Sequence, residues 1–410
     1  MQFFAGACRL GAPEILAIPL VLLRFPPCQP PKFVAPADVC YSWDTTLVTN
    51  RFLRALLEPV LAGGLSLLLL AALLAVSGYP VAESLSALWR GAFGSWSVLA
   101  SGTLVRATPL LFAGLAVAVA FRAGILNIGA EGQLLMGAVA ATAVAVNLAP
   151  VTGIAGLLCA LLAGVIAGGA WAAIAAVLRL RFGVLEVIST IMLNVIALNI
   201  TGMLVRGPLQ EPTRTFPQSA LIDQALRLPR LVAGSRLHAG VVLAVATALG
   251  IAWFLRATAP GFRLRMTGAN ASAAASAGRI DVVRVTLFAF VGSGAIAGLG
   301  GAVEVTGVTY ALYENLSPGY GFTAIAVALL ARLNPARAIG AAVIFGALEA
   351  GASAMQRDAQ VPAGMVGVVE ASVILVLVAS EWLGERAGKG GRLIRGGTPR
   401  TGAATPAPAT

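Results

Sequence analysis

The chain has 410 residues, of which 58% are hydrophobic and only 11% are charged, and its mean hydropathy is +0.89. So few charged residues cannot cover the surface of a soluble domain, so the composition predicts a helical membrane protein. A membrane β-barrel would need alternating apolar and polar residues, and the long apolar runs do not alternate. The net charge of +11 would suggest nucleic acid as the partner of a soluble protein. Here most arginines lie at the ends of apolar runs, where membrane topology and anionic lipid account for them, so no nucleic-acid partner is expected.

The N-terminal part differs from the rest of the chain, because it is rich in proline and holds three of the four cysteines. Its apolar stretch Ile15–Leu23 is too short to cross a bilayer. We expect a poorly ordered extension here, with the natural start of the protein near Leu47 or Val48. No cysteine belongs to a C-x-x-C pair, so we expect no disulfide framework, no metal site and no cofactor. The predicted division is an extension at 1–50, a transmembrane domain at 51–387 and a disordered cytoplasmic tail at 388–410.

Ten apolar segments follow in the central domain, and several are shorter than the roughly 20 residues that a spanning helix needs. They are Leu56–Ser77, Val98–Phe121, Leu134–Ala149, Gly153–Leu178, Val187–Val205, Ala239–Leu255, Val283–Val303, Gly321–Ala331, Ala338–Ser353 and Ala363–Ser380. Short segments in a bundle often line a cavity rather than span alone. The distribution of arginines favours both termini on the inner side, with the loop Gly207–Leu237 outside although it is itself rich in arginine.

An internal similarity suggests a repeat. The second segment ends in "AGLAVAV" (Ala113–Val119) and the seventh in "AGLGGAV" (Ala297–Val303), and each is followed by a polar stretch and a short apolar run. In the predicted topology the two segments run in opposite directions, which is the pattern of an inverted repeat of segments 2–5 and 7–10. Chance similarity between strings rich in alanine and glycine is the alternative. The fold class expected is therefore an all-α polytopic bundle of about ten transmembrane or partly spanning helices.

The stretch "GILNIGAEGQ" interrupts two apolar segments with Asn127, Glu131 and Gln133 among three glycines. A charged group at mid-membrane costs roughly 2.5–3.5 kcal/mol on insertion scales, so Glu131 should lie near an interface or face a polar cavity. The glycines permit a break in the helix, and a broken helix exposes amide hydrogens that a carboxylate or a ligand can bind. An ordinary inner loop with a helix cap is the alternative.

Further polar residues fall in or beside apolar segments, and intramembrane carboxylates are functional by default. We expect Glu186, Asn194 and Glu304 to line a translocation path, while the alternative is that such groups only bond a neighbouring helix. Tyr320 could stack on a base, although an aromatic belt at the membrane interface is the other interpretation. Gly164 and Gly168 form a G-x-x-x-G pattern that indicates close helix packing.

The stretch Arg106–Ala138 resembles the permeases of ABC importers for nucleosides and simple sugars. The resemblance continues through four further stretches: "RLRFGVLEVISTIMLN" (Arg179–Asn194), "GFRLRMTGANASAAASAGRI" (Gly261–Ile280), "GSGAIAGLGGAVEVTG" (Gly292–Gly307) and "GYGFTAIAVALLARLNP" (Gly319–Pro335). It extends from about Leu53 to Trp382 and is strongest to the nucleoside branch. It implies a type II importer-like fold in a bacterial inner membrane. It also implies an ABC ATPase subunit, a second permease subunit and an extracytoplasmic binding lipoprotein as partners, besides membrane lipid.

The resemblance also identifies a coupling helix, the contact point for the ATPase, within "GANASAAASAG". The residues on matching positions are Gly268, Asn270, Ala273, Ala274 and Gly278, while Ala275, Ser276 and Arg279 depart from the usual pattern. The chain has no G-x-x-x-x-G-K-[ST] phosphate loop, so any ATP must be bound by a partner, and no enzymatic activity is expected. The alternatives are a ribose-type sugar permease and an ion-coupled secondary transporter, which the buried carboxylates would allow.

Overall fold

The computed structural model describes residues 64–148, 153–276 and 278–362, together with scattered positions between 365 and 376. All of them belong to the compact unit Arg54–Thr410. The predicted N-terminal extension, the C-terminal tail and Glu370 lie outside the described residues, as does most of the tenth apolar segment. The described residues are helical with a few isolated β-bridges and no strand, in agreement with the predicted all-α bundle.

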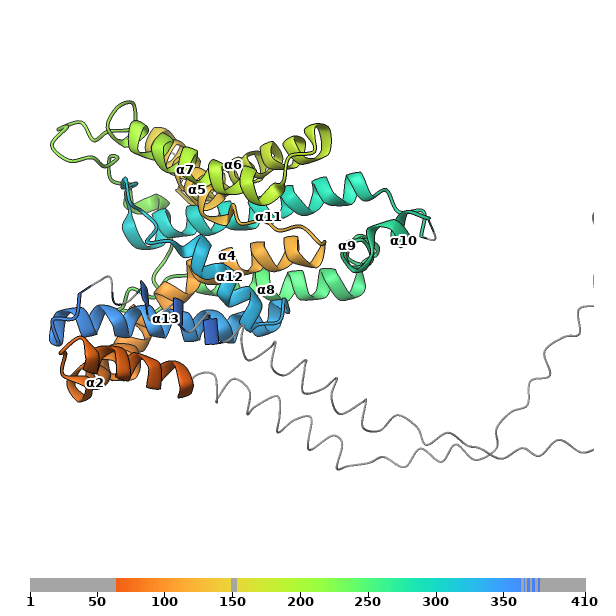
Figure 1. The fold of residues 1–410 in the computed structure, drawn as a ribbon. Coiled ribbons are helices and arrows are strands. Elements are labelled where there is room, and N and C mark those ends of the chain that lie inside the picture. The colour runs from red at the N-terminus through yellow and green to blue at the C-terminus, as the bar shows by residue number, and fades with distance from the viewer. Residues whose placement is uncertain are drawn as a thin grey trace, which may run out of the picture. The chain divides into compact units, whose positions relative to one another are not determined.

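The helices follow one another along the chain as shown in Figure 1. After an apolar helix at Gly64–Val76, they are α2 (Val81–Phe93), α3 (Trp96–Val98), the π-helix η1 (Leu99–Thr103), α4 (Leu104–Arg122), α5 (Ala130–Leu148), α6 (Gly153–Phe182), α7 (Glu186–Val205), the 3₁₀-helix η2 (Gln224–Leu226), α8 (Gly240–Ala257), α9 (Ala259–Ala269), α10 (Ala271–Ser276), α11 (Val282–Glu304), the π-helix η3 (Val305–Thr309), α12 (Tyr320–Leu330) and α13 (Pro335–Asp358).

Six helical stretches in the described part are long and apolar enough to cross a membrane. They are Trp96–Arg122, α6, α7, α8, Val282–Thr309 and α13. Helix α12 has only 11 residues, as the short eighth segment predicted. Helix α5 has 19 residues but begins with a polar turn. Partly spanning helices therefore accompany full spans, as is typical of transport proteins with broken helices.

Helix α11 lies at the centre of the bundle against α4, α5 and α6. Its contact with α6 is made by glycines, because a Cβ atom on Gly298 would overlap the carbonyl oxygen of Gly164, and one on Gly294 would overlap that of Gly168. Without side chains between them, the two backbones approach as closely as the G-x-x-x-G pattern predicted. The large side chains of the core, among them Phe112, pack around this seam of small residues.

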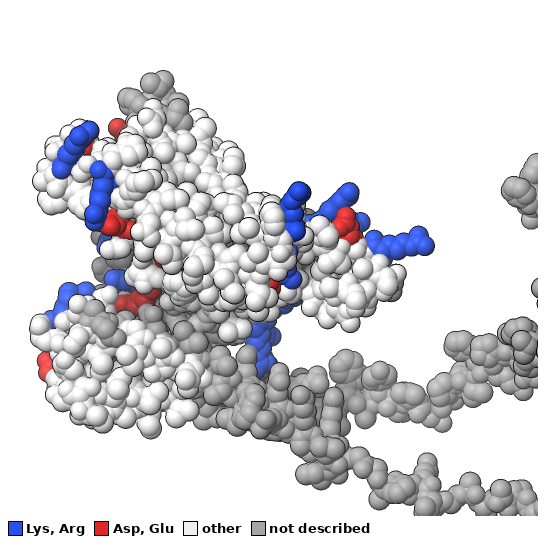
Figure 2. All heavy atoms as spheres, turned by 45° about the horizontal axis from the view of Figure 1, so that its top comes forward, with Lys and Arg blue, Asp and Glu red and all other residues white. Residues whose placement is uncertain are grey.

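Different elements lie at the two ends of the described part. Helices α9 and α10 lie at one end, and the long loop of residues 206–239 between α7 and α8 lies at the other (Figure 1). Figure 2 shows the charged side chains gathered toward two opposite edges with uncharged surface between them. This distribution fits a bundle whose middle faces lipid.

The order of elements is similar in the two halves. Helix α4 is followed by a break, helix α5 and the longer helix α6, while α11 is followed by a connection, the short helix α12 and the longer helix α13. This order agrees with the expected repeat of segments, although the inverted relation of the halves stays a prediction.

Candidate functional site

The break between α4 and α5 is held by a buried network around Asn127, whose side chain is not exposed at all. Its Oδ1 accepts hydrogen bonds from the N–H of Gly129 at 2.9 Å and from Nε2 of Gln133 at 3.1 Å. Its Nδ2 donates to Oγ of Ser293 on α11 at 2.9 Å, and that hydroxyl donates to the carbonyl oxygen of Ala116 at 2.8 Å. The break therefore satisfies its own polar groups through α4 and α11, as buried polar groups require.

Asn194 of α7 closes the same break from the other side. Its Oδ1 accepts from the N–H of Gly132 at 2.8 Å, and its Nδ2 donates to the carbonyl oxygen of Ile128 at 2.9 Å. Both partners are backbone groups that the start of α5 leaves without an intrahelical bond. Asn194 thus stabilises the non-helical backbone at the point where α5 begins.

Glu131 joins the start of α5 to the start of α12. It lies in the first turn of α5, and its Oε2 accepts a hydrogen bond from the N–H of Gly321 in the first turn of α12 at 2.6 Å. The side chain of Ser317 is a further hydrogen-bond partner of the same carboxyl group. A carboxylate at a helix N-terminus interacts favourably with the exposed N–H groups and with the helix dipole. Glu131 lies in the first turn of α5, and the helix end whose N–H group its carboxylate binds is that of α12.

A second polar cluster surrounds Glu304, the last residue of α11, which is 5% exposed. The positive charges that act on Glu304 are Arg236 and Arg106, and Glu304 in turn acts on Tyr320 at the start of α12. Arg106 of α4 also donates to Oγ of Ser353 on α13 at 3.2 Å. Charged groups of α4 and α11 therefore act electrostatically on one another and on Tyr320.

Glu186 stands apart from these clusters. Its carboxylate pairs with the guanidinium of Arg179 at 2.9 Å, across the turn between α6 and α7. None of the hydrogen bonds among the described residues joins its side chain to Asn127, Glu131 or Glu304. Sequence reasoning grouped Glu186 with the path residues because it precedes an apolar segment, but its partner is a residue of the neighbouring helix end.

Arg106 is the residue of this region that sequence reasoning missed. It lies within the second apolar segment, where an ionisable side chain is costly and therefore indicates function. The sequence signal that could have identified Arg106 is its position in the middle of the stretch "TLVRATPL". Its hydrogen-bond partner, Ser353, is 247 positions away in the sequence, and only the fold brings the two together.

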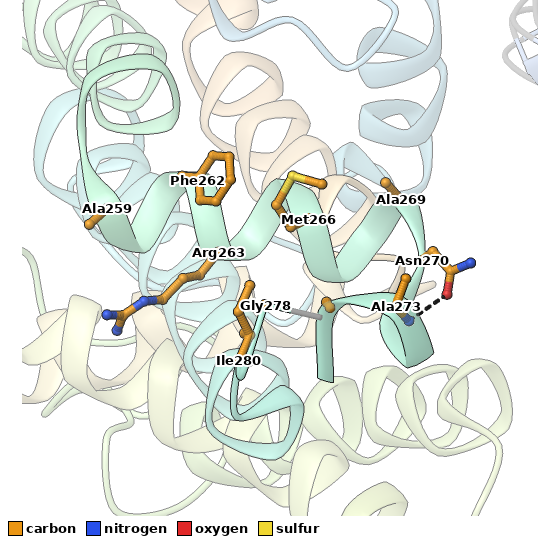
Figure 3. Close-up of a pocket in the computed structure, with 10 residues that line it drawn as sticks. Ala259, Phe262, Arg263, Met266, Ala269, Asn270, Ala273, Gly278 and Ile280 are labelled. Carbon is orange, nitrogen blue, oxygen red and sulfur yellow. Dashed lines mark hydrogen bonds between the residues drawn. The ribbon is translucent and has the colours of Figure 1, made fainter. Parts of the chain in front are cut away.

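At the opposite end of the described part, α9 and α10 form an elbow that encloses a groove with a volume of about 440 Å³. Figure 3 shows Phe262, Met266 and Ala269 along α9, Asn270 and Ala273 at the turn into α10, and Gly278 and Ile280 on the return. Four of the five predicted coupling residues line the groove, namely Asn270, Ala273, Ala274 and Gly278. The elbow therefore presents a concave surface of mostly small and apolar side chains.

The stretch "GANASAAASAG", within which the coupling helix is expected, contains the end of α9 and the short helix α10. Asn270 lies between them with extended backbone, and its Oδ1 accepts from the N–H of Ala273 at 3.0 Å, as an N-cap does. Gly268 belongs to α9, and a Cβ atom there would overlap the carbonyl oxygen of Arg122 at the end of α4. Ala274 is only 6% exposed, whereas Ala273 is exposed.

A helical bundle with broken helices at its centre and a grooved elbow at one end defines a polytopic membrane transport protein. The family model of the branched-chain amino acid transport system permease component matches residues 99–379, and the chain belongs to this permease family. It is a multi-pass membrane protein, and its relatives are permease subunits of transporters rather than enzymes.

Several characterised proteins are similar over most of the chain. The glucose ABC transporter permease protein TsgB13 of Haloferax volcanii is 41% identical over 289 residues, which is 68% of this chain and 76% of that protein. The guanosine ABC transporter permease protein NupP of Bacillus subtilis is 39% identical over 333 residues, 80% of this chain and 94% of that protein. The nucleoside ABC transporter permease protein NupB of Lactococcus lactis is 30% identical over 337 residues, 80% of this chain and 92% of that protein. No solved structure matches the chain.

Proposed function

We propose that this chain forms part of the membrane pathway of an ABC importer that takes up nucleosides, with ATP hydrolysed by separate ATPase subunits. The observation that carries the proposal is the grooved elbow of α9 and α10 at the end of the bundle opposite the long loop. An exposed groove lined by small side chains suits a partner protein better than a small polar substrate, and it coincides with the coupling residues that the family resemblance implies.

Nucleosides are preferred over sugars because of the extent of similarity. The guanosine and nucleoside permeases each match 80% of this chain and more than nine-tenths of their own length. The glucose permease has slightly higher identity, 41%, over a shorter part of both chains. A sugar substrate is therefore the second candidate function.

The proposed assembly places the elbow inside the cell and the long loop outside. The partners would be an ABC ATPase below the elbow, a second permease subunit in a heterodimer and an extracytoplasmic binding lipoprotein against the long loop. Both termini would then be cytoplasmic, and the chain would lie in a bacterial plasma membrane among its lipids, without nucleic acid as a partner.

The translocation path is proposed to pass the two polar clusters. Glu304, Tyr320 and Arg106 would face the moving substrate, because charged and phenolic groups can exchange hydrogen bonds with its hydroxyls. Asn127, Gln133 and Asn194 would shape the path by holding the break before α5, with Glu131 setting the distance between the starts of α5 and α12.

Uptake measurements test the proposal directly. Cells that lack their own nucleoside uptake would express this chain with its ATPase, second permease and binding protein, and labelled guanosine and glucose would be supplied separately. We expect guanosine uptake that unlabelled nucleosides suppress and glucose does not. Glucose uptake with guanosine excluded would establish the sugar function instead.

The same cells distinguish ATP-driven from ion-coupled transport. An ATPase variant that binds but does not hydrolyse ATP should abolish uptake. Uptake that persists with this variant and collapses when the proton or sodium gradient is removed would establish a secondary transporter and overturn the proposal.

A further inference from the structure

The long loop of residues 206–239 is bound along its length to the segment of residues 305–319, which we call the α11–α12 connection. Ser219 makes a two-way contact with it: its N–H donates to the carbonyl oxygen of Leu312 at 2.9 Å, and its Oγ accepts from the N–H of Leu312 at 2.9 Å. Gln218 and Tyr313 form an antiparallel bridge beside this contact. Ser219 is only 1% exposed, so these bonds are shielded from competing water.

The contact continues toward α11. The N–H of Ile222 donates to the carbonyl oxygen of Tyr310 at 2.8 Å, and the N–H of Leu228 donates to that of Thr306 in η3 at 3.0 Å. The guanidinium of Arg227 lies over the ring of Tyr310, 4.4 Å from its centroid. A cation over an aromatic face is an attractive contact that orients both groups.

The two ends of the long loop are attached to the same connection. Near its start, Arg206 forms an ion pair with Glu314. At its end, the buried ring of His238 packs against Gly307 of η3, so closely that a Cβ atom on Gly307 would overlap the ring. These seven residue pairs, spread from the start of the long loop to its end, all join it to one short segment.

The α11–α12 connection is itself in an unusual conformation. Its first part is the π-helix η3, a form of helix that is frequent at functional sites. Tyr310 follows with φ of 57°, in the left-handed region that non-glycine residues rarely adopt. Tyr310 is one of the residues that the long loop holds, through both its carbonyl oxygen and its ring. A strained residue that is held by contacts with another segment can change conformation when those contacts are lost.

The connection also joins the two path residues of the second cluster. It begins directly after Glu304 and ends directly before Tyr320, and Glu131 binds the next residue, Gly321. A displacement of the connection can therefore be passed on to Glu304 and Tyr320, which its two ends adjoin.

We propose that the long loop is a clasp on the α11–α12 connection, and that its opening and closing gates the path at Glu304 and Tyr320. The proposal rests on the proposed function, in which a binding protein docks on the long loop. Docking would pull the loop away from Leu312 and Tyr310, release the left-handed conformation of Tyr310 and shift Glu304 and Tyr320. Ser219 and Arg227 are then positioning residues, because they act on the path through the connection and do not touch the substrate.

A reversible disulfide across the clasp tests whether it opens. Residues directly opposite in an antiparallel pair have Cβ atoms about 4.5–5.5 Å apart, which is close to the separation that a disulfide requires. Gln218→Cys and Tyr313→Cys would be introduced together after Cys8, Cys28, Cys40 and Cys159 are changed to serine. The whole transporter would be assayed in vesicles before and after oxidation, with each single cysteine variant as the control.

Oxidation should lower uptake at least about five-fold in the double variant, which is the low end of typical coupling between sites. A reducing agent should restore uptake, while neither single variant should respond to the oxidant. The amount of ATPase that co-purifies should be the same before and after oxidation. Unchanged uptake with the disulfide formed would show that the clasp is static, and failure of the two cysteines to join would show that the contact does not exist in the membrane. Either result overturns the proposal.

Loosening the clasp should have a separate effect. Ser219→Ala removes the hydroxyl acceptor for Leu312, whereas Ser219→Thr keeps it. With Ser219→Ala we expect more ATP hydrolysis in the absence of substrate and less uptake for each ATP consumed, and with Ser219→Thr both values should return toward those of the unchanged protein. An equal amount of uptake for each ATP consumed in the unchanged protein, Ser219→Ala and Ser219→Thr would contradict a gating role. A failure of the proposed function would look different, since the unchanged transporter would then take up no guanosine even without any substitution in the loop.

Discussion

The carboxylate of Glu131 accepts a hydrogen bond from the N–H of Gly321 at 2.6 Å, although the two residues are 190 positions apart. This bond joins the first turn of α5 to the first turn of α12. A helix that ends within a bundle exposes N–H groups that water cannot reach, and Glu131 satisfies one of them. The bond also fixes the point where the two halves of the chain meet.

Glu131→Gln should therefore retain most uptake, because the amide oxygen of glutamine still accepts from Gly321. Glu131→Ala should lose the bond and lower the free energy of unfolding by about 1–2 kcal/mol, the usual cost of losing a helix cap. Thermal unfolding of the purified protein in detergent, together with uptake, measures both effects. If Glu131→Gln abolished uptake while folding normally, the carboxylate would have a proton-carrying role that the cap does not explain.

Asn194→Leu should destabilise the break before α5. The substitution leaves the N–H of Gly132 and the carbonyl oxygen of Ile128 without their partner, and each buried unsatisfied group costs about 1–3 kcal/mol. Asn199→Leu on the same helix is the matched control, because Asn199 is exposed and bonds only the carbonyl oxygen of Val195 within α7. Melting temperatures in detergent compare the two variants, and equal values would show that the break is not held by Asn194.

Gly298→Ala should be poorly tolerated because its Cβ atom would meet the carbonyl oxygen of Gly164. Overpacking of this kind typically costs about 1–3 kcal/mol. Gly292→Ala lies on the same helix with nothing near its Cβ position, so it should be neutral or slightly stabilising. Expression level and melting temperature separate the two, and a neutral Gly298→Ala would contradict the close contact of α6 and α11.

Ala273→Trp should weaken the association with the ATPase. Ala273 is exposed and lines the groove of the elbow, so an indole there would fill the space that the partner occupies. Ala274 is less suitable, because its buried position means that a tryptophan would disrupt the elbow itself. Ala275→Trp is the control, since Ala275 is exposed but does not line the groove. Co-purification of the ATPase measures the effect, and equal recovery with both variants would argue against the groove as the docking site.

Acidification should destabilise the end of the long loop through His238. Burial, and secondly the positive charge of Arg236, lower the pKa of this histidine from 6.5 to about 4. In the unfolded chain the ring gains a proton below pH 6.5, so the stability that the neutral ring provides is complete above pH 6.5. It is lost as the pH falls through that value toward 4, by up to about 3 kcal/mol. Melting temperatures at pH 7, 5.5 and 4 should fall more steeply for the unchanged protein than for His238→Asn.

The helical class and the positions of the helix breaks could be predicted from the sequence, because they depend on local patterns. Glycines and polar residues in an apolar run mark the break before α5, and the shortness of its segment marks α12. The partners across the fold could not be predicted in this way. Nothing near Glu131 in the sequence points to Gly321, and nothing near Arg106 points to Ser353.

The elbow of α9 and α10 also has features that could not be predicted from the sequence. Alanine favours helix, and so the stretch from Gly268 to Gly278 predicted a short helix. Composition does not show where that helix begins, whereas in the structure the side chain of Asn270 accepts from the backbone N–H of Ala273 and marks the start of α10, as asparagine often does at helix ends. Composition could not reveal which alanine faces inward, because all of them are alike and only the packing of Ala274 distinguishes it.

The contact between Gly268 and the carbonyl oxygen of Arg122 has a mechanical consequence. The two backbones touch with no side chain between them, so a displacement of the elbow cannot be absorbed by a change of rotamer. The end of α4 must move with it, and Arg122 passes the movement on, because its Nε donates to the carbonyl oxygen of Leu333 just beyond α12. The end of α4 therefore links the elbow to the segment that follows α12, and we expect a movement imposed on the elbow to displace that segment as well.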